Sequence, residues 1–157
     1  MKHYSVNYSK IINANRKEIW QVLAEHFGTI GDYSKGVLRS FYVSAQRKGI
    51  GTTRYCELPK AGFMREQVVI WKELEEFGFE ILETSMPLSS GSALYFRLQA
   101  LDFQRTKIKV EGTFRLQYLP FLSPLLKPKL RKTIEQMLVD IAAEIHKSQE
   151  KVSSCPN

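Results

Sequence analysis

The stretch SPLLKPKLRKTIEQMLVDIAAEIHK, residues 123–147, decides the fold of this chain. Apolar side chains recur in it at steps of three and four residues: Leu125, Leu126, Leu130, Ile134, Met137, Leu138, Ile141, Ala142 and Ile145. This spacing predicts the apolar side of one long amphipathic helix. Ser123 is its expected N-cap and Pro124 its first helical residue. A kink or restart is expected near Pro128, which lacks the N–H for a helical hydrogen bond.

The chain before this helix is predicted to be mostly β-strand. Turn signals rich in glycine and proline separate six expected strands, at Val37–Ala45, Thr52–Leu58, Gly62–Glu75, Phe77–Ser85, Ser92–Leu101 and Lys107–Tyr118. The last strand alternates most clearly, with Ile108 and Val110 on one face and Lys107 and Lys109 on the other. Gly112 predicts a bulge or a close backbone approach on the apolar face. The terminal helix must lie across that face to bury its own apolar side.

A further strand and short helices are expected at the start of the chain. Residues Ser5–Ile12 alternate as a strand. Asn15 and Glu18 have the spacing of a capping box and mark the beginning of a helix. Gly28 and Gly31 end it, followed by a short turn or second helix at residues 29–33.

Length and composition indicate one globular domain. The chain has 157 residues, 43% hydrophobic and 25% charged, and we expect a domain at 1–150 with a flexible tail at 151–157. No signal peptide or transmembrane segment is expected, because every apolar run is short. Cys56 and Cys155 are expected to be reduced thiols in a cytoplasmic protein.

The charge is strongly positive, formally +7. Such a balance favours anionic partners. Five cations, Lys35, Arg39, Arg47, Lys48 and Arg54, fall in a stretch without acidic residues. No DNA-binding motif is present, so specific nucleic-acid binding is not expected. Transient membrane contact is left open, as is the choice between a monomer and a homodimer.

Four motifs in this order resemble a known superfamily. They are INANRKEIWQVLAEHFGTIGDY at 12–33, GIGTTRYCEL at 49–58, GFMREQVVIWKE at 62–73 and VEGTFRL at 110–116. The sequence resembles the START-related SRPBCC superfamily, which includes birch-pollen-allergen-like proteins and polyketide cyclases/dehydratases. The resemblance implies an α+β helix-grip fold: a seven-stranded antiparallel sheet curved around a long C-terminal helix, with a short helix or two between strands 1 and 2. It also implies a hydrophobic pocket between sheet and helix.

Arg54 and Glu66 are the first candidate site residues. They lie on adjacent predicted strands joined through Pro59 and Gly62, so they can face each other. They could hold an anionic or carbonyl group in a pocket, with Glu66 as acid or base. A cross-strand ion pair that stabilises the sheet is the other interpretation, and the one we favour.

The other candidate ligand-binding residues are apolar or aromatic: Phe27, Tyr33, Phe79, Tyr95, Phe114 and Met137. Ligand pockets are lined by such side chains with a few polar tips. Plain core packing is the alternative for each of them. No catalytic residue, metal site or cofactor is predicted, because the three histidines lack ligand spacing and no phosphate-binding glycine loop is present.

The leading hypothesis is binding or transport of a small hydrophobic ligand, such as a lipid, fatty acid, quinone or polyketide, between sheet and terminal helix. One alternative is an enzyme of the polyketide cyclase/dehydratase type, in which Glu66 or a tyrosine acts as acid or base and Arg54 holds a carbonyl. The other is a module that contacts another macromolecule. The fold alone does not choose among them.

Overall fold

The computed structural model describes residues 3–116 and 123–155. The first strand, β1, spans His3–Ile12, and Val6 and Ile12 are buried on its inner face. The helix α1, Arg16–Trp20, begins after the predicted capping box: Asn15 Oδ1 accepts from the Glu18 amide and Glu18 Oε2 from the Asn15 amide. A π-helical turn η1, Gln21–Glu25, and a 3₁₀ turn η2, Phe27–Asp32, follow. The short second helix predicted after residue 28 is therefore confirmed, beginning at Phe27.

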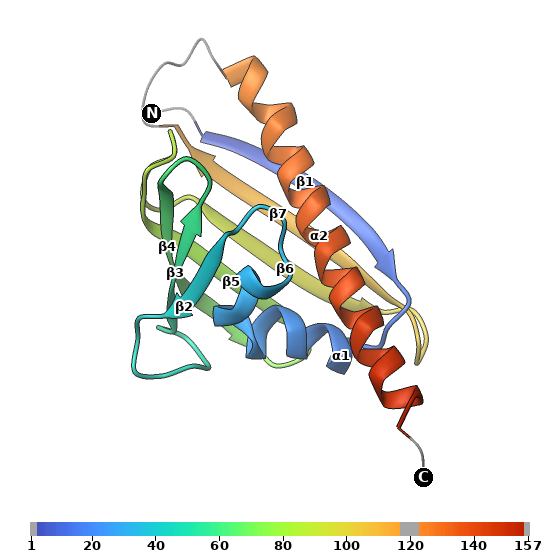
Figure 1. Cartoon of the computed structure of the whole chain (residues 1–157). Helices are drawn as coiled ribbons and strands as arrows, with labels where there is room; N and C mark the ends of the chain where they lie inside the picture. The colour runs from blue at the N-terminus through green and yellow to red at the C-terminus, as the bar shows by residue number, and fades with distance from the viewer. Residues whose placement is uncertain (1–2, 117–122, 156–157) are drawn as a thin grey trace.

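Six more strands complete the sheet: β2 Arg39–Tyr42, β3 Thr53–Leu58, β4 Gly62–Lys72, β5 Glu76–Thr84, β6 Ala93–Ala100 and β7 Thr106–Arg115. They form one seven-stranded antiparallel sheet in the order β1-β7-β6-β5-β4-β3-β2. The first strand thus lies beside the last, and the sheet ends at β1 and β2 (Figure 1).

Several strand predictions were too long; the strand predicted at Gly62–Glu75, for example, ends at Lys72. The segment predicted at Val37–Ala45 forms regular ladder only over Arg39–Tyr42. Beyond Tyr42 the ladder stops because the amides of Val43 and Ser44 both bond to the Thr53 carbonyl oxygen. The last strand ends at Arg115. The predicted continuation beyond Leu116 to Tyr118 lies outside the described residues.

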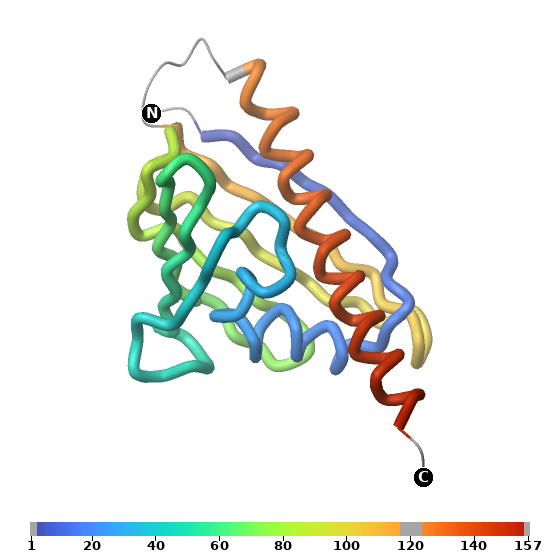
Figure 2. Tube along the Cα trace, in the orientation of Figure 1, coloured from blue at the N-terminus to red at the C-terminus, as the bar shows by residue number. Residues whose placement is uncertain are grey.

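The long helix α2 spans Ser123–Ser153 and lies across the inner face of the sheet alongside β1 (Figure 2). Its buried side includes Ile134, Leu138, Ile141 and Ile145, as predicted. The restart that was one of the two outcomes predicted near Pro128 does not occur, because the helix is continuous through it. The predicted end at Lys147 was also wrong, since helical hydrogen bonding continues through the charged residues to Ser153.

Leu125 does not belong to the buried side of α2. It is 72% exposed, because the first turns of the helix extend past the end of the sheet (Figure 1). The spacing of apolar residues predicts which side of a helix is buried. It does not predict how far along the helix the sheet that covers this side extends.

Gly112 makes a close backbone approach rather than a bulge. It stays in regular register with Val6 on one side and Leu94 on the other. A Cβ at this position would lie 2.6 Å from Cε2 of Phe114. The register shifts of the sheet lie between β4 and β5, at Arg65/Glu66 and Val68/Ile70.

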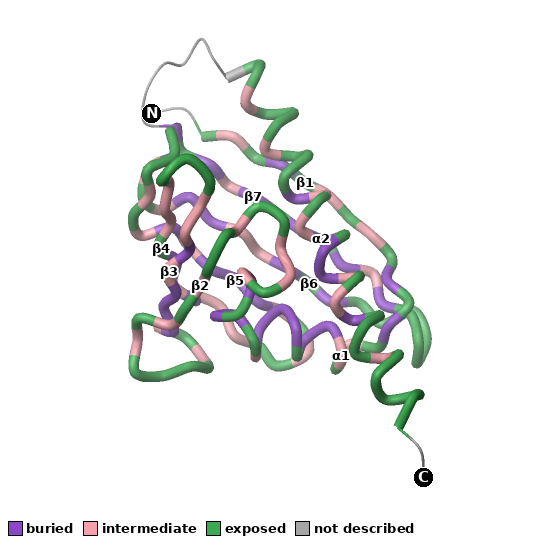
Figure 3. The backbone as a smooth tube through the Cα atoms, in the orientation of Figure 1, coloured by how far each residue is buried: buried purple, intermediate pink, exposed green. Residues whose placement is uncertain are grey.

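Aromatic rings fill the core beside α1 and η2. Phe77 lies at the centre, with its ring centroid 6.2 Å from that of Trp20, 5.5 Å from Phe27 and 6.1 Å from Phe79. Phe96 on β6 packs against both Phe77 and Phe79. These rings are buried. Figure 3 shows that backbone in the middle of α2 is buried as well. Side chains thus occupy this half of the space between sheet and helices.

Candidate functional site

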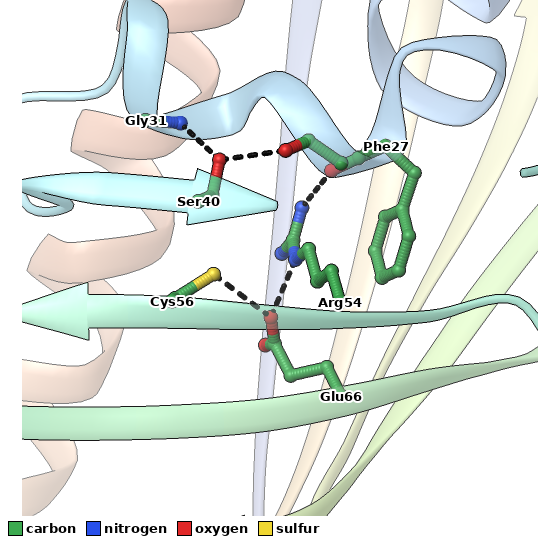
Figure 4. Close-up of polar contacts among 7 residues, drawn as sticks. Phe27, Gly31, Ser40, Arg54, Cys56 and Glu66 are labelled. Carbon is green, nitrogen blue, oxygen red and sulfur yellow. Dashed lines mark hydrogen bonds and ion pairs between the residues drawn. The ribbon is translucent and has the colours of Figure 1, made fainter. Parts of the chain in front are cut away.

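Arg54 and Glu66 form a buried ion pair between β3 and β4. They are direct partners in the antiparallel register, so their side chains leave the same face of the sheet. Arg54 Nε donates to Glu66 Oε2 at 2.7 Å, and each residue is only 4% exposed (Figure 4). The sequence prediction that these two residues face each other is confirmed.

The Arg54 guanidinium is enclosed from three sides. Its Nη1 donates to the Phe27 carbonyl oxygen at 2.7 Å, which ties β3 to η2. The guanidinium carbon also lies 3.9 Å from the centroid of the Phe27 ring and 5.1 Å from that of Phe79. Cations over aromatic faces gain electrostatic stabilisation when water is excluded. Burial is the largest single effect and lowers the pKa of Arg54, but the neighbouring groups together, with Glu66 foremost, more than offset it, so the pKa is raised and the charge is kept.

Cys56 belongs to the same cluster. It lies two residues after Arg54 and therefore on the same face of β3. Its Sγ donates to Glu66 Oε2 at 3.8 Å (Figure 4). Burial raises the pKa of Cys56 to about 12, so the thiol stays protonated and is a poor nucleophile. The strand alternation could have placed Cys56 here, but the sequence analysis treated it only as a free thiol; the structure confirms that both cysteines are free.

The turn of η2 is fastened to β2 directly above the ion pair. Ser40 Oγ donates to the Gly28 carbonyl oxygen and accepts from the Gly31 amide, each at 2.8 Å (Figure 4). A Cβ on Gly31 would lie 2.6 Å from the Ser40 amide nitrogen, so glycine is needed for this close approach. Sequence reasoning identified Gly31 as a helix stop but missed Ser40, because only the fold brings β2 over this turn.

Tyr33 lies at the end of η2, half-buried against the core. Burial raises its pKa to about 12, partly offset by the nearby Arg54 charge. Phe27 and Phe79 are buried against Arg54, so four of the predicted site residues, Phe27, Arg54, Glu66 and Phe79, are in contact and Tyr33 is near them.

The remaining three predicted residues lie elsewhere. Phe114 is buried on β7 next to Gly112, and Met137 on α2 is half-buried against the core. Tyr95 does not face α2: it alternates with buried Phe96 and its ring lies over Gly78 on the outer face of the sheet. Tyr95, a candidate for the pocket between sheet and helix, therefore lies on the opposite face of the sheet, because one step along a strand reverses the face.

Asp140 is a buried carboxylate that the sequence analysis missed. Its Oδ2 accepts from the Lys35 amide at 3.0 Å, and its Oδ1 accepts from Gln136 Nε2 at 2.9 Å. It thereby ties α2 to the segment that follows η2. An acidic residue one turn after Met137, on the apolar side of the helix, was the available signal.

Hollows lie outside the core of the described part of the chain. One lies on the outer face of β1, β6 and β7, and another lies between β1 and the N-terminal half of α2. Within the same residues, no group of three or more histidine, cysteine or acidic side chains is placed to hold a metal. None of the described helices is long and apolar enough to cross a bilayer.

Comparison with known proteins gives structural matches only. No family model matches the sequence, and no curated protein sequence matches it. A START superfamily protein from Mycobacterium smegmatis superposes with a TM-score of 0.77 at 12% identity, over 93% of this chain and 99% of that one. The Zhui aromatase/cyclase from a Streptomyces species gives 0.72 at 14% identity, over 93% and 95%. The protein Ara h 8.0201 gives 0.74 at 13% identity, over 93% and 99%.

Each of these superpositions covers 93% of this chain. At such low identity they establish the architecture and leave the activity to the residues of this chain. The seven-stranded antiparallel sheet holding a long C-terminal helix is a START-like helix-grip fold.

Proposed function

We propose that this protein binds a small hydrophobic molecule between the sheet and α2. One observation carries the proposal: inward-facing apolar side chains are more deeply buried in one half of the inner face of the sheet than in the other. Beside α1 the rings of Trp20, Phe27, Phe77 and Phe96 are fully buried, and only Trp71 next to Trp20 is partly exposed among the rings packed there. Toward the N-terminal half of α2, inward-facing apolar side chains remain partly exposed, namely Tyr4, Met64, Leu94, Leu130 and Met137. An apolar ligand covering these side chains would remove their surface from water.

The chemistry of these side chains suits an apolar ligand with few polar groups. Met64 and Met137 are flexible and polarisable, so they adapt to ligands of different shape. Tyr4 Oη is buried and has no hydrogen-bond partner among the described residues. A buried hydroxyl without a partner is costly, and a ligand oxygen would satisfy it. The fold relatives support this proposal at the level of architecture: one is named a START superfamily protein and another an aromatase/cyclase.

The test is saturable binding of a fluorescent fatty acid analogue, with native mass spectrometry of fresh protein to detect a bound molecule. Met137→Lys places a charge against the half-closed side and should weaken binding by more than about tenfold, since a buried unpaired charge is costly. Val139→Lys is the matched control, because Val139 is 43% exposed on the same helix. Equal affinity in the two folded variants, or no saturable binding by the native chain, would contradict the proposal.

The enzymatic alternative stays a prediction. Glu66 Oε2 already accepts from Arg54 and Cys56, and Arg54 is enclosed by Phe27 and Phe79. This geometry favours the structural interpretation of the pair over an acid–base role. The choice between a carrier and a cyclase rests on whether turnover is found with any bound molecule that native mass spectrometry identifies.

A further inference from the structure

The outer face of the sheet carries a hollow of about 450 Å³ on the side away from the core. Lys107, Lys109 and Glu111 point into it from β7, because they alternate with the buried Ile108 and Val110. Tyr95 and Arg97 from β6, Asn7 and Ser9 from β1, and Arg131 from α2 complete its polar lining. This site is separate from the proposed ligand-binding face.

The charge in the hollow is unbalanced, with four cations against the single carboxylate of Glu111. Arg97 and Lys109 are direct cross-strand partners. Like charges directly opposite each other destabilise a sheet. Glu76 offsets only part of this repulsion, since its two oxygens are shared between Arg97 at 3.3 Å and Lys72 at 2.8 Å.

Lys107 and Lys109 have no carboxylate within ion-pair distance in the described part of the chain. They lie on the same face of β7 two residues apart, close enough for one polyatomic anion to contact both. Their ammonium groups are therefore available as donors, and an anion between them would relieve the repulsion with Arg97.

The positive lining continues around the edge of the sheet. The second hollow, of about 470 Å³, shares Asn7 and Arg131 with the first and adds Lys127 from α2. Arg131 is itself paired with Glu135 at 3.2 Å, so Lys127 and the two β7 lysines supply most of the uncompensated charge. The net charge of +7 adds a long-range attraction for anions.

We propose that the basic hollow binds a phosphate group, carried either by a soluble phosphorylated molecule or by a lipid headgroup. Phosphate has several acceptor oxygens and more than one negative charge, which match a cluster of lysine and arginine donors. Asn7 and Ser9 offer neutral polar contacts, and the Tyr95 ring supplies a flat wall for the body that carries the phosphate.

The first arm of the test measures the melting temperature against inorganic pyrophosphate at constant ionic strength. The native chain should show a saturable rise. The Lys107→Gln/Lys109→Gln variant should bind pyrophosphate at least about tenfold more weakly, because each lysine donates a charge-assisted hydrogen bond. Lys147→Gln/Lys151→Gln, at the other end of α2, makes the same change in net charge and should respond as the native chain does. An equal response in both double variants, or none in the native chain, overturns the proposal.

The second arm asks about the source of the phosphate. Vesicles of phosphatidylcholine with phosphatidylglycerol should co-sediment with the native chain through Lys107 and Lys109 if the source is a lipid. Pyrophosphate binding without vesicle binding assigns a soluble source, and either result supports the site.

The single variant Lys109→Gln tests the repulsion independently. At low salt and without phosphate it should melt above the native chain, because the charge opposite Arg97 is gone. This difference should shrink at high salt. A variant no more stable than the native chain at low salt would remove the electrostatic basis of the site.

Discussion

Arg54 on β3 and Glu66 on β4 are exact neighbours across the ladder, and their charged groups meet at 2.7 Å in the interior. Removing two charges from water is costly, and good geometry with further hydrogen bonds is needed to offset that cost. The Phe27 carbonyl and the two flanking rings provide this environment. The pair therefore fastens η2 onto the sheet.

Replacing Glu66 by Gln should destabilise the protein by about 3–5 kcal/mol, because it leaves the Arg54 charge buried without its counter-charge. Urea unfolding measures the change. Glu83→Gln is the matched control. Glu83 on β5 forms an exposed ion pair with Arg65 on β4, at 3.4 Å. Loss of an exposed pair should cost less than about 1 kcal/mol. Equal, small effects of the two substitutions would show that the buried pair is not what holds η2.

Replacing Asp140 by Ala should release the segment after η2 from α2. The carboxylate accepts from the Lys35 amide and from Gln136, so its loss should cost about 1.5–3 kcal/mol. Hydrogen exchange of the Lys35 amide should become much faster in the variant. Glu135→Ala removes an exposed carboxylate from the same helix and should leave that amide protected. Unchanged exchange at Lys35 in Asp140→Ala would contradict this role.

Tyr33 should make stability fall with pH in the alkaline range. Burial raises its folded-state pKa from 10.0 to about 12. Between these two values the unfolded chain loses the proton first, so the folded state binds more protons and the free energy of unfolding falls as pH rises. Urea unfolding at several pH values measures the slope.

The Tyr33→Phe variant should lose this part of the pH dependence. Other groups titrate in the same range, so the comparison rests on the difference between the native chain and the variant. Parallel stability curves for the two proteins from pH 10.0 to about 12 would show that Tyr33 does not titrate with the raised pKa.

Replacing Gly112 by Ala should strain the inner face of the sheet. The added Cβ would lie 2.6 Å from one atom and 2.9 Å from another of the Phe114 ring, which is itself buried and cannot move away freely. Overpacking of this kind costs about 1–3 kcal/mol. Gly36→Ala is the control, since its Cβ would meet nothing within 4 Å. Thermal unfolding compares the two, and equal melting temperatures would contradict the expected strain.

Strand alternation predicted many of the residues that gather at the site, but it did not place every one of them on the correct face of the sheet. Arg54 and Glu66 were found because a short hairpin fixes their register. Tyr95 was placed on the wrong face, since the sequence segment Ala93–Ala100 mixes apolar residues on both faces. Ser40 and Asp140 were missed because their partners are distant in sequence and meet them only after folding.

The sequence by itself determined the order of elements, the capping box at Asn15 and the apolar side of α2. These features depend on local periodicity and on hydrogen bonds between residues a few positions apart. Only the tertiary structure decided that Arg54 binds the Phe27 carbonyl, that Leu125 stays exposed, and that Arg97, Lys107 and Lys109 gather in one hollow. Each depends on which strands become neighbours and where the sheet ends, and those are set by packing of the whole chain.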